Sequence, residues 1–272
     1  MIQKFIEEAL RGKSETTIRT YAHALKQFEE WLQGTRADLT SFARSDVQQY
    51  LDYLTSKRKS AATINKIWNA IKKYCKWAGK KEAIEDISVV KPVDYKQLAP
   101  KALDRLERNR LLREVDRTGN KRDIAIVTTL LMTGLRVSEL VALNREDVEI
   151  SERIGEMRVV GKGNKERIIP LNAEVRRALT KYLEERSDSH PALFLSNRME
   201  RISVRSVQRI IEQYGFHAHQ LRHTFITGLV RDNQDIAVIQ SLSGHSSADM
   251  ILRYSRPNEE DKIQAVESIY KD

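Results

Sequence analysis

A chain of 272 residues, 40% of them hydrophobic, is long enough for one large domain or two modest ones with a buried core. Its net charge of +9 favours a polyanionic partner, nucleic acid before membrane. The single cysteine, Cys75, excludes an internal disulfide and fits a reducing compartment. We find no signal peptide and no run of about 18 apolar residues, so we expect a cytoplasmic protein without membrane attachment.

The N-terminal third predicts a small bundle of amphipathic helices. Apolar residues recur at helical spacing over residues 14–33, and Ser14 is a natural N-cap for that helix. A second helix is expected over 45–55, and a third begins at Ser60. Each helix has one apolar face, which favours packing of the three against one another.

A strongly basic stretch covers residues 57–81, where lysine and arginine alternate with aromatic residues and no acid occurs. One interpretation is a solvated helix face with its aromatic residues in the core. The absence of acids favours a second, a surface that follows DNA phosphates, because each bound lysine releases condensed counterions. The candidate DNA-binding residues are Lys57, Arg58, Lys59, Lys66, Lys72, Lys73 and Lys76.

Two prolines in residues 91–101 predict a linker between a helical domain over 1–90 and a second domain over 102–272. Alternating residues on both sides of a glycine-rich turn predict a β-hairpin over 157–171. The remaining patterns are helical, so the fold class is mainly α with a small β-sheet. The further helices are expected over 123–132, 137–143, 172–186, 203–213, 219–231, 235–242, 247–254 and 259–270.

Two short stretches in the second domain place cations beside glycines. In T-G-L-R-V-S-E-L, Arg136 comes just before a helix, whose N-terminal N–H groups also favour an anion. The alternative is a surface arginine paired with Glu139. In G-K-G-N-K-E-R, Lys162 lies in a tight turn, where a lysine is commonplace and Lys165 is a rival.

A third stretch, H-A-H-Q-L-R-H-T-F, combines histidines with an arginine. His219 and Arg222 are three residues apart and therefore share a helix face. His217, His219 and His223 also invite a zinc interpretation. It is disfavoured, because no glutamate completes the motif and Arg222 would place a cation beside the metal. His223 is expected to pack or hydrogen-bond within the fold.

The fourth stretch, S-G-H-S-S-A-D-M-I-L-R-Y, carries His245 and, nine residues later, Tyr254. Alone, His245 reads as a histidine after a helix-capping glycine, and Tyr254 as a half-buried packing residue. Tyr270, near the chain end, is the nearby rival of Tyr254.

In this order, the four stretches resemble the tyrosine recombinase (phage integrase) family, and most closely its Xer-type members. The resemblance implies an N-terminal helical core-binding domain and a C-terminal catalytic domain. Family members usually carry leucine where Ser243 stands, which puts local packing in doubt but not the chemistry. The implied catalytic residues are Arg136, Lys162, His219, Arg222, His245 and Tyr254, with Glu139 as the supporting acid.

The chemistry of these residues suits attack on a DNA phosphodiester without a cofactor, metal or ATP. Arg136 and Arg222 can hold the non-bridging oxygens and stabilise the charge that develops there. The resemblance implies that Tyr254 attacks the phosphorus and that Lys162 protonates the leaving 5′ oxygen. His219 is the candidate general base, because histidine exchanges protons near neutral pH; which histidine acts remains open.

The resemblance also implies the partners. We expect double-stranded DNA with a specific site, bound by a homotetramer that holds two such sites, at the nucleoid. Residues 259–272 would form a helix exchanged between protomers; the alternative is a helix packed on its own domain. The expected role is resolution of chromosome dimers. Alternatives are integration or excision of mobile DNA, a type IB-like topoisomerase, and a non-catalytic DNA-binding protein.

Overall fold

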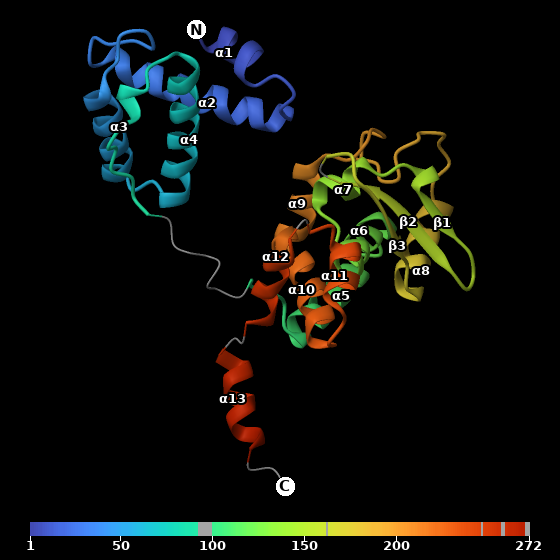
Figure 1. The fold of residues 1–272 in the computed structure, drawn as a ribbon. Coiled ribbons are helices and arrows are strands. Elements are labelled where there is room, and N and C mark those ends of the chain that lie inside the picture. Colours follow the sequence, from blue (N-terminus) through green and yellow to red (C-terminus); the bar gives the residue numbers. More distant parts are fainter. Residues whose placement is uncertain (92–99, 162, 246, 257–258, 270–272) are drawn as a thin grey trace. The chain divides into compact units, whose positions relative to one another are not determined.

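The structure, a computed structural model, describes residues 1–91, 100–161, 163–245, 247–256 and 259–269. It divides into two compact units, Met1–Asp94 and Tyr95–Asp272. The expected linker over 91–101 lies mostly outside the described residues. Mainly helical structure with a small sheet is confirmed (Figure 1).

The first unit is a helical bundle, as its sequence predicts. Its elements are α1 (Ile2–Ala9), α2 (Glu15–Gln33), α3 (Arg44–Ser56), α4 (Ala61–Trp77) and the short 3-10 helix η1 (Glu82–Ile84). The hydroxyls of Ser14 and Ser60 accept hydrogen bonds from the third residue of α2 and α4, which confirms the predicted cap at Ser14 and makes Ser60 the cap of α4. Helix α1 was not predicted; its Phe5 is buried against Tyr74 and Trp77.

Helix α6 is the buried central helix of the second unit. Its helices are α5 (Arg105–Arg117), α6 (Lys121–Thr133), α7 (Val137–Ala142), α8 (Ala173–Glu184), α9 (Val204–Glu212), α10 (Ala218–Arg231), α11 (Ile236–Ser243), α12 (Ala248–Leu252) and α13 (Glu259–Ser268), with short 3-10 helices η3 (Arg145–Asp147) and η4 (Arg253–Ser255). Residues 125–131 of α6 are buried, and α8 and α10 pack against this helix. α6 ends at Gly134, whose φ of 63° is left-handed.

The sheet has three antiparallel strands, β1 (Val148–Ile150), β2 (Gly155–Val160) and β3 (Glu166–Pro170), in the order β1-β2-β3 (Figure 1). Met157 of β2 pairs with Ile169 of β3, and both side chains are buried. The predicted hairpin is thus confirmed. The sequence did not predict β1, because three residues are too few to show alternation, nor did it predict α5.

Candidate active site and DNA-binding surfaces

Arg222 is held at the centre of a polar cluster by the carbonyl ends of two helices. Its Nη1 donates to the carbonyl of Gly134, which caps α6, and its Nη2 donates to the carbonyl of Ser243, the last residue of α11, at 2.7 Å. The side chain is buried, with 4% of the residue exposed. The negative ends of two helix dipoles therefore stabilise this cation, and no carboxylate has to be displaced before a phosphate can approach.

Arg136 stands at the N-cap of α7, as the sequence predicts. Its Nη1 donates to Glu139 Oε1 and its backbone N–H to Oε2, both at 2.8 Å. Glu139 is buried and also accepts two hydrogen bonds from Arg167, at 2.8 and 3.2 Å. The expected pairing of Arg136 with Glu139 therefore exists, but it orients the arginine within a cluster.

Arg167 is a site residue that the sequence did not single out. It is the second residue of β3, and its Nε also donates to the carbonyl of Leu242, 3.0 Å away, which joins the sheet to α11. Only its position as the last residue of G-K-G-N-K-E-R marked it. Burial alone would raise the pKa of Glu139, but hydrogen bonds from Arg167 and Arg136, together with the charge of Arg167, outweigh that effect and lower it.

Burial, followed by the charge of Arg136, lowers the pKa of Arg222 to about 10. Arg222 still carries its charge at neutral pH. The charge of Arg136 also acts on His245 and Tyr254, where it favours the neutral ring and the phenolate respectively. The site therefore has excess positive charge, which suits an incoming phosphate.

His245 lies against Arg222, since its Nε2 is 3.3 Å from Nη2 of the arginine. Its Nδ1 is 3.1 Å from the hydroxyl of Ser243, which is fully buried. Burial, and then Arg222, lower the pKa of His245 to about 4. The ring is therefore neutral at pH 7.

Tyr254 lies beside His245, with the ring centroids 6.1 Å apart. It stands in η4 rather than in an α-helix, because α12 ends at Leu252. Burial raises the pKa of its hydroxyl despite the opposing charge of Arg222. A neutral phenol in this position needs a proton acceptor before it can act as a nucleophile.

The Tyr254 hydroxyl is 2.8 Å from Nδ1 of His223. Burial, and then His219, lower the pKa of His223 to about 4, so its ring is neutral, and Nδ1 accepts the hydrogen bond in the tautomer that carries the proton on Nε2. His219 is exposed and lies beside His223, with ring centroids 6.3 Å apart. The sequence predicted that His223 hydrogen-bonds within the fold, but not that its partner is Tyr254.

Lys162 lies outside the described residues. The turn around it is closed by a hydrogen bond from the Gly161 N–H to the Lys165 carbonyl at 2.8 Å. Gly163 and Asn164 both have positive φ, as the tight turn requires. Lys165, the rival lysine, is exposed.

Gly134→Ala is expected to lower the free energy of unfolding of the second unit by about 2 kcal/mol, from left-handed strain plus a clash. An added Cβ would meet Cδ1 of Phe225 at 2.4 Å, and the shift would move the carbonyl that holds Arg222. Calorimetry of the full chain measures the change. Gly119→Ala is the matched control, because its φ is also positive but its Cβ meets nothing within 4 Å. Equal losses in the two variants would contradict the clash.

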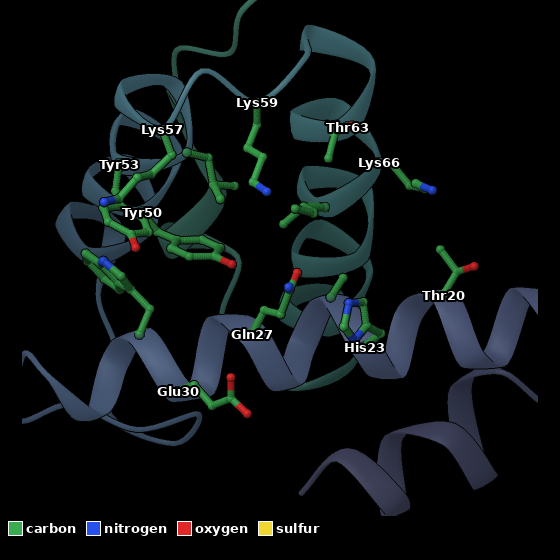
Figure 2. A pocket seen from close by; sticks show the side chains of 14 residues that line it. Thr20, His23, Gln27, Glu30, Tyr50, Tyr53, Lys57, Lys59, Thr63 and Lys66 are labelled. Atoms are coloured by element: carbon green, nitrogen blue, oxygen red, sulfur yellow. The ribbon is translucent and has the colours of Figure 1, made fainter.

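The candidate DNA-binding lysines divide between two hollows of the first unit. Lys57, Lys59 and Lys66 line the larger, of about 850 Å³, which we call the basic hollow. Thr20, His23 and Gln27 line it from one face of α2, and Glu30 adds an acid. Figure 2 shows Lys59 and Gln27 reaching into it from opposite sides. It therefore combines phosphate-binding cations with uncharged hydrogen-bonding groups.

A second hollow, of about 570 Å³, is lined by Lys72, Lys73 and Lys76 of α4 together with Tyr21 and Trp77. Arg58 lies in the loop between α3 and α4 with a φ of 54°. The sequence grouped all seven residues as one basic stretch. Their places along the chain separate them, because Lys57 and Lys59 lie between α3 and α4, whereas Lys72, Lys73 and Lys76 lie in the C-terminal half of α4.

Among the described residues, no three histidine, cysteine, aspartate or glutamate side chains group so that they could hold a metal ion. Within the same residues, no helix is both long and apolar enough to cross a membrane.

Known proteins resemble this chain along most of its length. The profile of the phage integrase family matches residues 101–261, and that of the phage integrase N-terminal SAM-like domain matches residues 2–82. Tyrosine recombinase XerA of Pyrococcus furiosus is 36% identical over 95% of this chain and 89% of its own length. Tyrosine recombinase XerD of Staphylococcus epidermidis is 31% identical over 90% of this chain and 89% of its own.

Solved structures of recombinases share the fold. A crystal structure of XerA recombinase is 26% identical, with a TM-score of 0.55 and coverage of 100% of this chain and 98% of that one. XerH bound to its difH substrate is 22% identical, with a TM-score of 0.72 and coverage of 99% and 84%. The profile match over residues 101–261 and the identity to XerA and XerD together establish the family. The chain belongs to the phage integrase family and is a Xer-like tyrosine recombinase, an enzyme that exchanges DNA strands at specific sites.

Proposed function

We propose that the chain cleaves and rejoins DNA through a 3′-phosphotyrosyl intermediate formed on Tyr254. The oxygen of Tyr254 bonds to the scissile phosphorus, the bond from phosphorus to the 5′ oxygen breaks, and a 5′-hydroxyl is released. The new link keeps the energy of the phosphodiester, so religation to another strand needs no ATP. The observation that carries this proposal is the cluster itself, in which Tyr254, His245 and Arg222 adjoin one another beside Arg136.

In this mechanism, Arg136 and Arg222 bind the non-bridging oxygens of the phosphate. Their charges stabilise the negative charge that builds up during in-line displacement. The fixed orientation of both supports the proposal, since Glu139 holds one guanidinium and two helix-terminal carbonyls hold the other. His245 adds a hydrogen bond to the phosphate. Glu139 supports the site by keeping Arg136 and Arg167 in place.

Two proton transfers complete the reaction. We propose that His223 retains the neutral Tyr254 hydroxyl in the free protein and that His219 takes its proton once DNA is bound. The support is that His223 already binds the hydroxyl, whereas His219 is exposed at the edge of the site. The proposed donor to the leaving 5′ oxygen is Lys162, in the turn between β2 and β3.

The direct test is covalent trapping. Nicked duplex fragments of the host's DNA are incubated with the protein in EDTA, and denaturing gels report protein–DNA adducts. An adduct that survives EDTA and maps to one sequence supports a metal-free, site-specific tyrosine mechanism. Specific binding without any adduct would instead favour an architectural role. Relaxation of a plasmid that lacks the site would favour a type IB-like topoisomerase.

Within recombinases, we propose resolution of chromosome dimers at the nucleoid. The similarity to the Xer-type tyrosine recombinases XerA and XerD supports this role. Integration or excision of mobile DNA is the alternative. It is supported by a TnP I resolvase of Bacillus thuringiensis that is 31% identical over 91% of this chain and 92% of its own length. The mapped cleavage site distinguishes the two roles, because it lies in the chromosome or in a mobile element.

We propose that the basic hollow binds the DNA duplex, with its lysines on phosphates and α2 toward the base edges. Lys66→Ala is expected to weaken binding similarly for all sequences and to lower the slope of log K against log salt by about 1. Fluorescence anisotropy at several salt concentrations measures it. Lys26→Ala removes the same charge from an exposed position on α2 outside the hollow. Equal losses of DNA affinity in both variants would mean that Lys66 acts only through the net charge of the protein and not through its place in the basic hollow.

We propose that the protein acts as a homotetramer on two DNA sites and that α13 docks on a neighbouring protomer. The apolar residues Ile263 and Val266 of α13, and Ile269 just after it, are 57%, 62% and 71% exposed. Such exposure supports a partner surface over packing on its own unit. The acceptor on the neighbour would have to bury these three side chains.

Deleting residues 259–272 is expected to leave DNA binding intact but to abolish the larger protein–DNA complexes. Ile263→Ser is expected to weaken them as well, because it removes buried apolar contact. Sedimentation of the protein on DNA measures both effects. Glu267→Ser, at an exposed polar position of the same helix, is the matched control. Unchanged assembly after the deletion would exclude the exchange.

A further inference from the structure

Ser243 stands where it can control the protonation of His245. Its hydroxyl is fully buried and 3.1 Å from Nδ1 of the imidazole. On the other side of the ring, Nη2 of Arg222 is 3.3 Å from Nε2. Both nitrogens of His245 therefore have a partner within the protein, and the two partners differ in what they can do.

A guanidinium can only donate hydrogen bonds. One hydrogen of Arg222 Nη2 goes to the Ser243 carbonyl at 2.7 Å, which leaves the other for His245. Nε2 must then accept, so the single proton of the neutral ring sits on Nδ1. The Ser243 hydroxyl accepts that N–H, which fixes the tautomer.

A phosphate changes this requirement, because a histidine that binds a phosphate oxygen through Nε2 needs its proton there. Arg222 Nη2 would turn its second hydrogen to the phosphate and release Nε2. One proton would leave Nδ1 for solvent and one would be taken up at Nε2, so the ring stays neutral. Nδ1 then needs a donor, and a hydroxyl can serve, since it donates as well as accepts.

We propose that Ser243 is a positioning residue that keeps Nδ1 of His245 hydrogen-bonded in either tautomer, as acceptor in the free protein and as donor when a DNA phosphate is bound. An apolar side chain would leave Nδ1 buried without a partner. The function of His245 toward DNA in this proposal rests on the proposed recombinase mechanism. The tautomer of the free protein does not depend on it.

The first experiment reads the tautomer directly, by nitrogen NMR of the full chain labelled with ¹⁵N-histidine at pH 7 without DNA. His245→Gln assigns the signals. We expect Nδ1 to be protonated in the wild type, and Ser243→Ala to yield a mixture of tautomers. A wild-type ring protonated on Nε2, or spectra unchanged in Ser243→Ala, would overturn the proposal.

The second experiment is a double-mutant cycle on the rate of adduct formation. Ser243→Ala is expected to slow the reaction roughly tenfold, as loss of an orienting partner does. In the His245→Gln background, Ser243→Ala should not slow adduct formation any further. Ser243→Thr keeps the hydroxyl and should therefore form the adduct at the wild-type rate. Ser241→Ala is the control, because the exposed Ser241 hydroxyl bonds only within its helix end, to the Val238 carbonyl.

Additive losses in the cycle would show that Ser243 acts through packing or Arg222, and would overturn the proposal. If the wild type forms no adduct on any DNA, the proposed recombinase mechanism fails. The NMR comparison then still decides whether Ser243 sets the tautomer. The failures of the two proposals are therefore distinguishable.

Discussion

Tyr254→Phe is expected to abolish the covalent protein–DNA adduct and to leave DNA binding unchanged. The variant lacks only the hydroxyl oxygen, which in our mechanism forms the bond to phosphorus. Its loss also frees Nδ1 of His223, but the ring stays in the cluster beside His245. Denaturing gels measure the adduct, and anisotropy with the same fragments measures binding.

Tyr214→Phe is the matched control for this prediction. The Tyr214 hydroxyl is also buried in the second unit, but no hydrogen-bond partner for it exists among the residues that the structure describes. Its removal should leave the adduct at the wild-type level. An adduct that persists in Tyr254→Phe would assign the nucleophile to another residue, with Tyr270 as the first candidate.

Arg222→Lys should slow adduct formation by about 10²- to 10³-fold, the usual cost of losing one donor to a developing oxyanion. Lysine keeps the charge, but a single ammonium cannot reproduce a planar group that binds two carbonyls and His245 together. The loss should therefore fall on the rate of cleavage at saturating protein. Single-turnover kinetics on nicked DNA measures that rate.

Arg177→Lys makes the same substitution at an exposed arginine of α8 and should leave the rate unchanged. A small effect in Arg222→Lys, comparable with that of the control, would mean that charge alone suffices at this position. The proposal that the planar guanidinium of Arg222 binds the phosphate bidentately would then be wrong.

Local patterns in the sequence predicted the elements that carry the site. The cap at Ser14 was predicted because a capping hydroxyl bonds to an N–H only three residues away. The hairpin between β2 and β3 was predicted because alternation and a glycine turn lie within one short segment. The family resemblance then selected the site residues, which single positions could not.

Contacts between distant residues could not be predicted in this way. Arg222 reaches carbonyls 88 and 21 residues away, and a carbonyl acceptor leaves no mark in a sequence because every residue has one. The ion pair of Arg167 with Glu139, 28 residues apart, is equally hidden. The partner of Tyr254 was missed for the same reason. Packing of η4 on α10 brings His223 to the Tyr254 hydroxyl, and no local sequence pattern encodes that packing.

The use of main-chain carbonyls to hold Arg222 has a consequence for evolution. Mutation can replace a carboxylate that pairs with a cation, but it cannot remove a peptide carbonyl. The side chain at position 243 can therefore change without deleting the acceptor that its carbonyl provides. Selection should instead act on the path of the chain at these helix ends, and so on Gly134 and Gly244, which cap α6 and α11 with left-handed φ values of 63° and 66°. In homologous sequences, we expect these two glycines to vary less than the side chain at position 243.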